Sequence, residues 1–134
     1  AICITQTTAP HAFSYKITSM YGLPHGHAVA VGLPRIWTYM VQHMDKCIDK
    51  RGTDYLSRTF MDIAAVMGCN SPQDAIETFY EIMHEMDMKD PVSTQKKQDL
   101  EILSGSVNPI RLRNNPVELD NDAIMELYTK IIAE

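Results

Sequence analysis

Two histidines, His11 and His25, are the residues of this sequence whose type and spacing most directly suggest chemistry. Imidazole is the commonest protein ligand of divalent transition metals, and three of the five histidines lie in one short stretch around this pair. Pro10 favours a helix start just before His11, whereas Gly22 and Pro24 favour a helix end just before His25. Two imidazoles on successive helices can converge on one point, which is the outline of a metal site.

The same spacing also has explanations that need no metal. Histidines on either side of a turn serve as helix caps, as hydrogen-bonded core residues or as surface groups. A tetrahedral zinc site needs four ligands. The three cysteines, Cys3, Cys47 and Cys69, form no C-x-x-C pair that would complete the shell. From spacing alone, the pair is an incomplete site.

Two further groups of polar residues have a structural and a functional interpretation. His84 lies beside Glu81 and Glu85, which resembles a metal cluster, but neighbouring charges on an exposed helix face explain these residues more simply. Arg111 and Arg113 lie in a segment rich in proline and asparagine. They could contact an anionic ligand, although pairing with the acidic surface is the favoured interpretation.

The elements that must hold the histidines are predicted to be helices. No two stretches alternate with period two, and residues 27–33 are apolar on every side, which predicts a buried central helix that Pro34 kinks or ends. Apolar residues recur at helical spacing over 36–44, 55–67, 76–86 and 124–132. We therefore expect an all-α domain, an irregular bundle of about five or six helices.

Local signals give the expected helix ends. The expected N-terminal caps are Thr7 or Thr8, Ser71, Ser93 and Asp120. The expected stops are Gly68 and Gly105. The helix that starts after Ser71 should bury Ile76, Phe79, Tyr80, Met83 and Met86. Residues 106–119 should form an extended, ordered loop before the last helix.

Composition excludes several classes of partner and site. The formal net charge of −5 over 134 residues argues against nucleic acid and against an anionic membrane surface. No apolar run is long enough to span a bilayer. An odd number of cysteines without paired spacing predicts free thiols in a reducing compartment, and so a cytoplasmic protein.

The segment around the two histidines resembles the metal-binding segment of the iron-containing alcohol dehydrogenases. The resemblance is carried by His11, Tyr21, Pro24-His25-Gly26, Ala28-Val29-Ala30 and Leu33-Pro34, with the fourteen-residue step between the histidines. Asn108-Pro109 and Asn115-Pro116-Val117 resemble, more weakly, the segment that precedes the family's last helix. The run from Thr8 to Tyr15 is most similar to the branch that contains phosphonoacetaldehyde reductases. The related dehydroquinate synthases fit the histidine spacing less well.

The resemblance implies that His11 and His25 bind a divalent metal, iron or zinc. In that family an aspartate and a third histidine from an earlier helix complete the site, and NAD or NADP binds to an N-terminal domain with a glycine-rich loop. This sequence has six glycines and no such cluster. We therefore expect residues 1–134 to be a single helical domain, the C-terminal fragment of a longer chain.

Tyr15 is the candidate catalytic residue beside the metal ligands. Many members of the family carry another histidine four residues after the first ligand, where this sequence has Tyr15. A side chain one helical turn from His11 faces the same side of the helix. Its phenol would then be able to hydrogen-bond a substrate oxygen.

Two functional hypotheses follow. In the first, the chain is part of a metal-dependent, nicotinamide-linked alcohol dehydrogenase or small-aldehyde reductase, and is inactive on its own. Its partners would be a small alcohol or aldehyde and its own N-terminal domain, and an apolar face left uncovered could make it a homo-oligomer. In the second, it is a non-enzymatic helical interaction module derived from the same fold.

Overall fold

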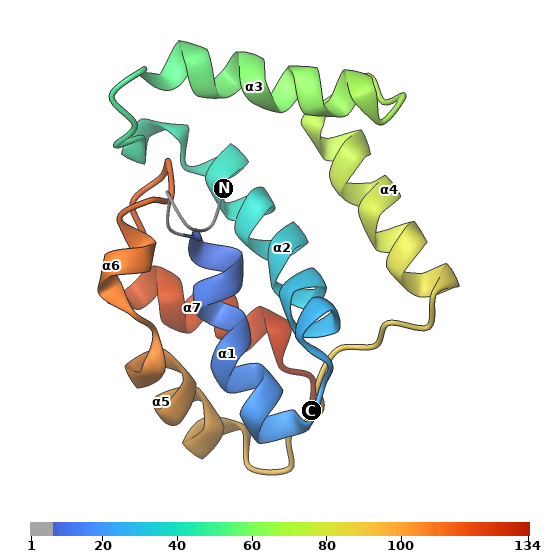
Figure 1. The fold of residues 1–134 in the computed structure, drawn as a ribbon, viewed down its shortest axis with the longest axis vertical. Helices are drawn as coiled ribbons and strands as arrows, with labels where there is room; N and C mark the ends of the chain where they lie inside the picture. The colour runs from blue at the N-terminus through green and yellow to red at the C-terminus, as the bar shows by residue number, and fades with distance from the viewer. Residues whose placement is uncertain (1–6) are drawn as a thin grey trace.

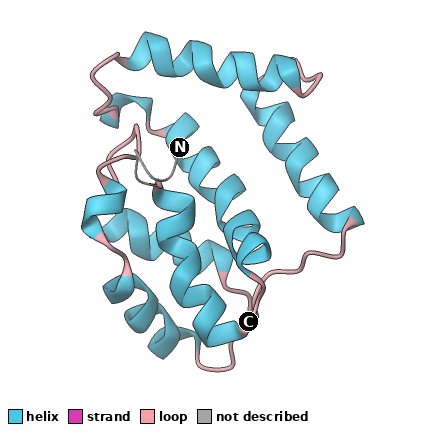
Figure 2. Ribbon diagram, in the orientation of Figure 1, coloured by secondary structure: helices cyan, strands magenta, loops and turns pink. Residues whose placement is uncertain are grey.

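Helices make up the part of the chain that the structure describes. A computed structural model describes residues 7–134. The elements are α1 (Ala9–Tyr21), α2 (His25–Gln42), a short 3-10 helix η1 (Met44–Lys46), α3 (Thr53–Val66), α4 (Pro72–Glu85), α5 (Lys96–Ser106), α6 (Pro109–Leu112) and α7 (Asn121–Ile131). Between residues 7 and 134 there are two isolated bridges and no strand (Figure 2). The all-α prediction is confirmed, with one short helix more than expected.

The helices that carry the two histidines lie at the centre of the fold. α1 packs along α2, α7 packs against α2 and α5, and both α5 and α6 contact α1 (Figure 1). α4 packs against α2, whereas α3 is held by α4 and η1 on the far side of the molecule. α1 therefore lies between α2 on one side and α5 and α6 on the other (Figure 1).

Within the core, side chains of α1 meet side chains of α7. Phe13, Ile17, Leu127 and Tyr128 are fully buried, and burial of each such side chain stabilises the fold by roughly 1.5–3 kcal/mol. The ring of Tyr128 stacks on Phe13 with 4.5 Å between centroids. Its hydroxyl donates to the Phe13 carbonyl at 3.2 Å, so the phenol is buried without losing its hydrogen bond.

Two of the predicted caps are present. The side chain of Ser71 accepts a hydrogen bond from the Asp74 amide at 3.2 Å, and that of Asp120 accepts from the Ala123 amide at 2.8 Å. These bonds satisfy amides that the first turn of a helix leaves free. Thr8 occupies the cap position of α1, but its side chain makes no capping hydrogen bond.

Pro34 was expected to kink or to end the helix that contains it. It does not end the helix, since α2 continues through this residue to Gln42. Proline removes one helical hydrogen bond at a cost of about 3 kcal/mol. Pro34 is itself buried, and Ile36 and Trp37 beyond it belong to the core. Burial of these apolar side chains offsets the free-energy cost of the missing hydrogen bond.

The predicted boundaries of α5 were also wrong. Ser93 does not cap the helix, because its Oγ accepts from the Gln95 amide at 3.0 Å and donates to Asp99 at 2.6 Å, and the helix begins only at Lys96. Gly105 does not stop it, since the helix continues to Ser106. The expected loop over 106–119 contains α6, which Asn108 caps through the Ile110 amide.

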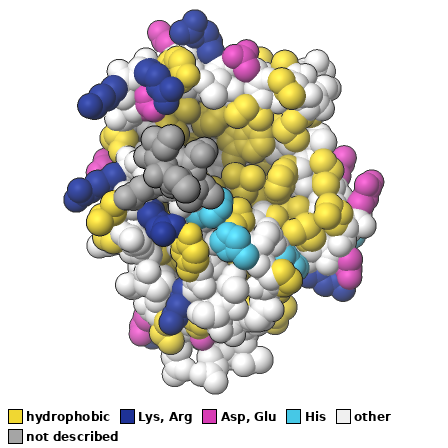
Figure 3. Space-filling model, viewed as in Figure 1, with side chains coloured by type: hydrophobic (Ala, Val, Ile, Leu, Met, Phe, Trp, Pro, Cys, Tyr) yellow, Lys and Arg dark blue, Asp and Glu magenta, His cyan; other side chains and the backbone are white. Residues whose placement is uncertain are grey.

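Apolar side chains remain exposed on the outer helices. Met86 was predicted to be buried but is 65% exposed, because α4 has ended at Glu85 and the chain turns away. Figure 3 shows a broad hydrophobic area over α2, α3 and α4. Within residues 7–134, none of the helices combines the length and the apolar character that crossing a bilayer requires.

Replacing Tyr128 by phenylalanine should lower the free energy of unfolding by about 1 kcal/mol, the usual contribution of a buried neutral hydrogen bond. Urea unfolding followed by circular dichroism would measure it. The matched control is Tyr55→Phe on the exposed face of α3, which should change stability by less than about 0.5 kcal/mol. Equal effects for the two variants would show that the bond to Phe13 contributes nothing specific.

Asp99 joins three segments through one carboxylate. Its Oδ2 accepts from Tyr21 at 2.7 Å and from Ser93 at 2.6 Å. These hydrogen bonds, from Ser93 and then from Tyr21, lower the pKa of Asp99. Burial, followed by the bond to Asp99, raises the pKa of Tyr21 to about 12. The carboxylate and the neutral phenol are therefore the forms that the folded chain favours.

The pKa of Asp99 is lower in the folded chain than in the unfolded chain, where it is about 3.9. The contribution of Asp99 to the free energy of unfolding is therefore fully present above the unfolded pKa, and it is lost as the pH falls through the lower folded pKa. We expect Asp99→Asn to destabilise the chain at pH 7 and the difference from wild type to shrink below about pH 4. Thermal unfolding between pH 7 and pH 3 would measure it. A difference that does not change with pH would contradict this assignment.

Candidate metal centre

α1 presents the first histidine and Tyr15 on the face opposite the core. Ala12, Phe13 and Ile17 are buried on the inner side of the helix, whereas His11 is half-buried and Tyr15 is 47% exposed. Residues four apart lie one above the other on a helix. The core contacts of α1 therefore fix the direction in which His11 and Tyr15 point.

The second histidine is the first residue of α2. Gly22 takes the left-handed conformation after α1 with φ of 67°, which glycine adopts without strain. Pro24 is extended, with φ of −54° and ψ of 146°, and its carbonyl accepts from the Ala28 amide at 2.9 Å. His25 is thereby held at the very start of α2, where its side chain is exposed.

The structure brings the two imidazoles together. Their ring centroids are 5.3 Å apart and their planes are inclined by 50°. A metal–nitrogen bond of about 2.1 Å places each ring centroid about 3.2 Å from the metal, so two rings at a tetrahedral angle have centroids about 5 Å apart. The observed separation therefore fits two imidazole ligands of one divalent ion.

Tyr15 belongs to the same cluster, as the sequence predicted. Its ring stacks on His25 with 5.7 Å between centroids and 26° between planes. The guanidinium carbon of Arg111 lies 4.7 Å from the centre of the Tyr15 ring, and Nη1 of Arg111 donates to the phenol oxygen. The phenol oxygen accepts this bond, and no acceptor for its own hydrogen lies among residues 7–134, so that hydrogen is available to a substrate oxygen.

Arg111 was predicted to pair with acidic side chains, and this is wrong for the part of the chain that the structure describes. Its recorded partners are Tyr15 and Thr7, whose Oγ1 accepts from Nη1 at 2.7 Å, and none of the ion pairs within residues 7–134 includes it. α6 carries Arg111 to the start of α1. The sequence signal for this placement was only that an arginine lies in the segment before the last helix.

The remaining histidines make other contacts. A ring nitrogen of His27 lies 2.7 Å from the Lys89 carbonyl, and one of His43 lies 2.9 Å from the Tyr39 carbonyl. His84 is exposed on α4, as expected for a solvated face. Cys47 and Cys69 are free thiols, and Cys3 lies outside the described residues. Over residues 7–134, no group of three or more histidine, cysteine, aspartate or glutamate side chains could hold a metal ion.

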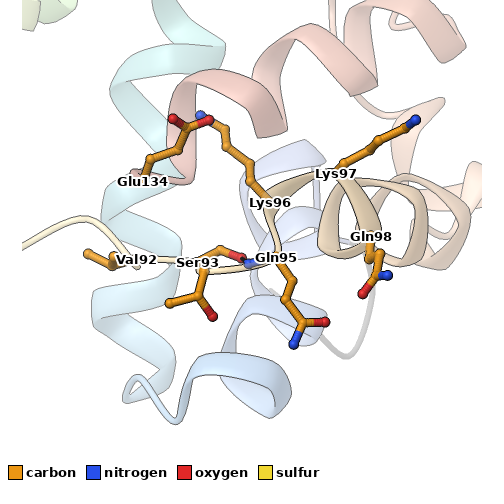
Figure 4. A pocket seen from close by; sticks show the side chains of 8 residues that line it. Val92, Ser93, Gln95, Lys96, Lys97, Gln98 and Glu134 are labelled. Atoms are coloured by element: carbon orange, nitrogen blue, oxygen red, sulfur yellow. Dashed lines mark hydrogen bonds between the residues drawn. The ribbon is translucent and has the colours of Figure 1, made fainter.

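A separate open hollow of about 760 Å³ lies at the start of α5. It is lined by residues 92–98 and Glu134, and none of the residues of the histidine cluster reaches it (Figure 4). Most of the residues that line it are polar or charged, and none of them is a histidine. The candidate site is instead the cluster of His11, His25, Tyr15 and Arg111, and Figure 3 shows histidine side chains gathered on one face beside a basic group.

Several known proteins are similar to this chain in sequence or in fold. A curated relative, the phosphonoacetaldehyde reductase of Streptomyces viridochromogenes, is 41% identical over 69 residues, which are 51% of this chain and 18% of the relative. The solved iron-containing alcohol dehydrogenase of Thermococcus thioreducens superposes with a TM-score of 0.71 at 25% identity over 91% of this chain. The sulfoacetaldehyde reductase of Bifidobacterium kashiwanohense, solved in complex with NAD+, has the same fold, with a TM-score of 0.72 at 22% identity over 93% of this chain.

The chain spans only part of these proteins, 18% of the curated relative and 31% of each solved structure. The sequence profile of the C-terminal part of the Fe-containing alcohol dehydrogenase family matches residues 1–132. Because this match covers nearly the whole chain, the chain belongs to the Fe-containing alcohol dehydrogenase family and corresponds to its C-terminal region.

Proposed function

We propose that this chain is the C-terminal domain of a longer, metal-dependent and nicotinamide-linked reductase of small aldehydes, which also oxidises the corresponding alcohols. The observation that carries the proposal is the 5.3 Å separation of the His11 and His25 rings. That separation suits two ligands of one metal, in a chain that belongs to an alcohol dehydrogenase family. The likeness to a phosphonoacetaldehyde reductase supports a small aldehyde as substrate.

His11 and His25 are the proposed ligands of the metal, which is iron or zinc. Both imidazoles must be neutral to bind it. When bound, the metal supplies Lewis-acid polarisation of the substrate oxygen while NAD(P)H provides the hydride. Tyr15 lies against His25, where its hydroxyl hydrogen is available to the same oxygen. Its proposed role is to orient the carbonyl group and to stabilise negative charge on the oxygen.

The described residues provide two of the ligands that a closed coordination shell requires. We propose that the other ligands and the dinucleotide site come from the rest of a longer protein, and that this chain is inactive by itself. The free Cys47 and Cys69 support a reducing compartment such as the cytoplasm. The exposed apolar area on α2, α3 and α4 is a candidate contact with the rest of the protein or with a second copy.

In the full-length protein, His11→Ala and His25→Ala should each lower metal affinity by at least about 10–100-fold, the loss that even outer-shell substitutions cause. Elemental analysis gives the metal content, and oxidation of NADH or NADPH with small aldehydes gives the activity. The control is His84→Ala, because His84 is exposed on α4 and lies outside the cluster. It should keep both metal and activity.

Two results would contradict this proposal. If the wild type holds stoichiometric metal that both alanine variants retain, His11 and His25 are not its ligands. If the full-length wild type holds no metal and reduces no aldehyde, the histidines are structural. The alternative of a non-enzymatic helical interaction module would then be favoured.

Tyr15→Phe removes the phenol oxygen but keeps the ring that stacks on His25. We expect kcat/KM for aldehyde reduction to fall about 10-fold, the effect of one lost hydrogen bond to the reacting oxygen, with metal content unchanged. Tyr80→Phe on α4 is the control, since no hydrogen bond of its hydroxyl is recorded within residues 7–134. An unchanged kcat/KM for Tyr15→Phe would limit Tyr15 to a packing role.

A further inference from the structure

Arg111 differs from the other arginines of the described chain. Arg35 pairs with Asp90 at 2.6 Å, and Arg51 pairs with Asp49 at 2.9 Å. Arg58 and Arg113 are exposed to solvent. Arg111 is half-buried, and within residues 7–134 it has no carboxylate partner. A guanidinium that is partly removed from water and not neutralised is placed to bind an anion.

The hydrogen bonds of Arg111 leave one edge of its guanidinium available. Both recorded bonds, to Tyr15 and to Thr7, are donated by Nη1. No partner of Nη2 or Nε is recorded within residues 7–134. Nη2 and Nε form a planar fork that binds two oxygens of a carboxylate, phosphonate or sulfonate at once. Tyr15 and Thr7 therefore fix the group, and among the described residues nothing occupies its binding edge.

The position of this edge relative to the metal ligands sets the size of the ligand. The guanidinium carbon is 4.7 Å from the centre of the Tyr15 ring, which is 5.7 Å from the centre of the His25 ring. Bonds of about 1.5 Å place the carbonyl oxygen of a two- or three-carbon aldehyde about 4–6 Å from an anionic group at its other end. Both of these distances are comparable to this length, so a short aldehyde with an anionic end is of a size to lie between the histidines and Arg111.

We propose that Arg111 is a specificity-determining residue that binds an anionic oxo group, such as a phosphonate or a sulfonate, at the far end of a short-chain aldehyde substrate. Tyr15 is then also a positioning residue, because its hydroxyl and ring hold the guanidinium. This inference rests on the proposed function, since it assigns Arg111 to the end of the aldehyde substrate that is remote from the carbonyl group. It also gives a reason for a cation beside the metal ligands of a chain with a net charge of −5.

The test uses the full-length protein and two aldehydes of the same shape. Phosphonoacetaldehyde carries a tetrahedral anion, and 3,3-dimethylbutanal carries a neutral tert-butyl group in its place. We expect the wild type to prefer phosphonoacetaldehyde, and Arg111→Ala to lose about 10- to 100-fold more in kcat/KM for that substrate than for 3,3-dimethylbutanal. Arg111→Lys keeps the charge without the planar fork, so its kcat/KM for phosphonoacetaldehyde should lie between those of the wild type and Arg111→Ala. Arg113→Ala, two residues further along and exposed, should match wild type.

Each alternative outcome has a distinct meaning. Equal losses on both aldehydes would overturn the role of Arg111 in specificity. A rise in KM for NADH or NADPH, with the preference between aldehydes unchanged, would assign Arg111 to the cofactor and also overturn it. A wild type that reduces only the neutral aldehyde would overturn this inference but keep the proposed function. A metal-loaded wild type that reduces neither would overturn both.

Binding gives a second readout that does not depend on turnover. Isothermal titration calorimetry with 2-hydroxyethylphosphonate should show binding to the wild type and to Arg113→Ala, and affinity at least about 10-fold weaker for Arg111→Ala. Thermal unfolding of the same samples would identify a variant that has simply lost its fold. A folded Arg111→Ala that binds this phosphonate as tightly as wild type would refute the proposal.

Discussion

The contact between His11 and His25 depends on how the chain returns from the end of α1 to the start of α2. The helix from His11 to Tyr21 carries the chain about 15 Å away, so a compact turn would leave His25 at the far end of α1. The left-handed Gly22 and the extended Pro24 instead send the connection back beside α1, and Leu23 packs against the core (Figure 1). A connection of three residues recovers at most about 10 Å, and the two side chains span the rest.

The parts of the fold that were predictable from sequence are those determined by neighbours in the chain. The starts of α4 and α7 each depend on a hydrogen bond that an amide donates to the cap side chain three residues earlier. The predictions failed where distant groups decide the outcome. Ser93 bonds Asp99, which also accepts from Tyr21 of α1, and α2 continues through Pro34 because residues beyond it are buried in the core. Tertiary packing overrides local preference in such cases.

The residues of the candidate site also fall into those that the sequence could place and one that it could not. Helical spacing placed Tyr15 beside His11, and the family resemblance pointed to His25. The structure then brought all three rings together. Arg111 could not be placed from sequence, because its partners Tyr15 and Thr7 lie about a hundred residues earlier in the chain. From sequence, an arginine in an acidic protein is expected to pair with acidic side chains. Only the packing of α6 against α1 shows that an aromatic ring and a hydroxyl hold it instead.

The position of Arg111 depends in turn on an irregular segment that is ordered by backbone hydrogen bonds. The Ile48 amide donates to the Pro116 carbonyl at 2.9 Å, and the Glu118 amide donates to the Lys46 carbonyl at 3.0 Å. The buried Asn115 donates from its side chain to the Val117 carbonyl at 2.7 Å. The segment that follows α6 is thus tied to the chain after α2, while the histidines lie at the starts of α1 and α2. Tyr15 and Thr7 hold the guanidinium from the side of α1, whereas this segment holds the backbone that carries it. Substitutions around Asn115 should therefore move the Arg111 backbone without acting directly on the imidazole pair.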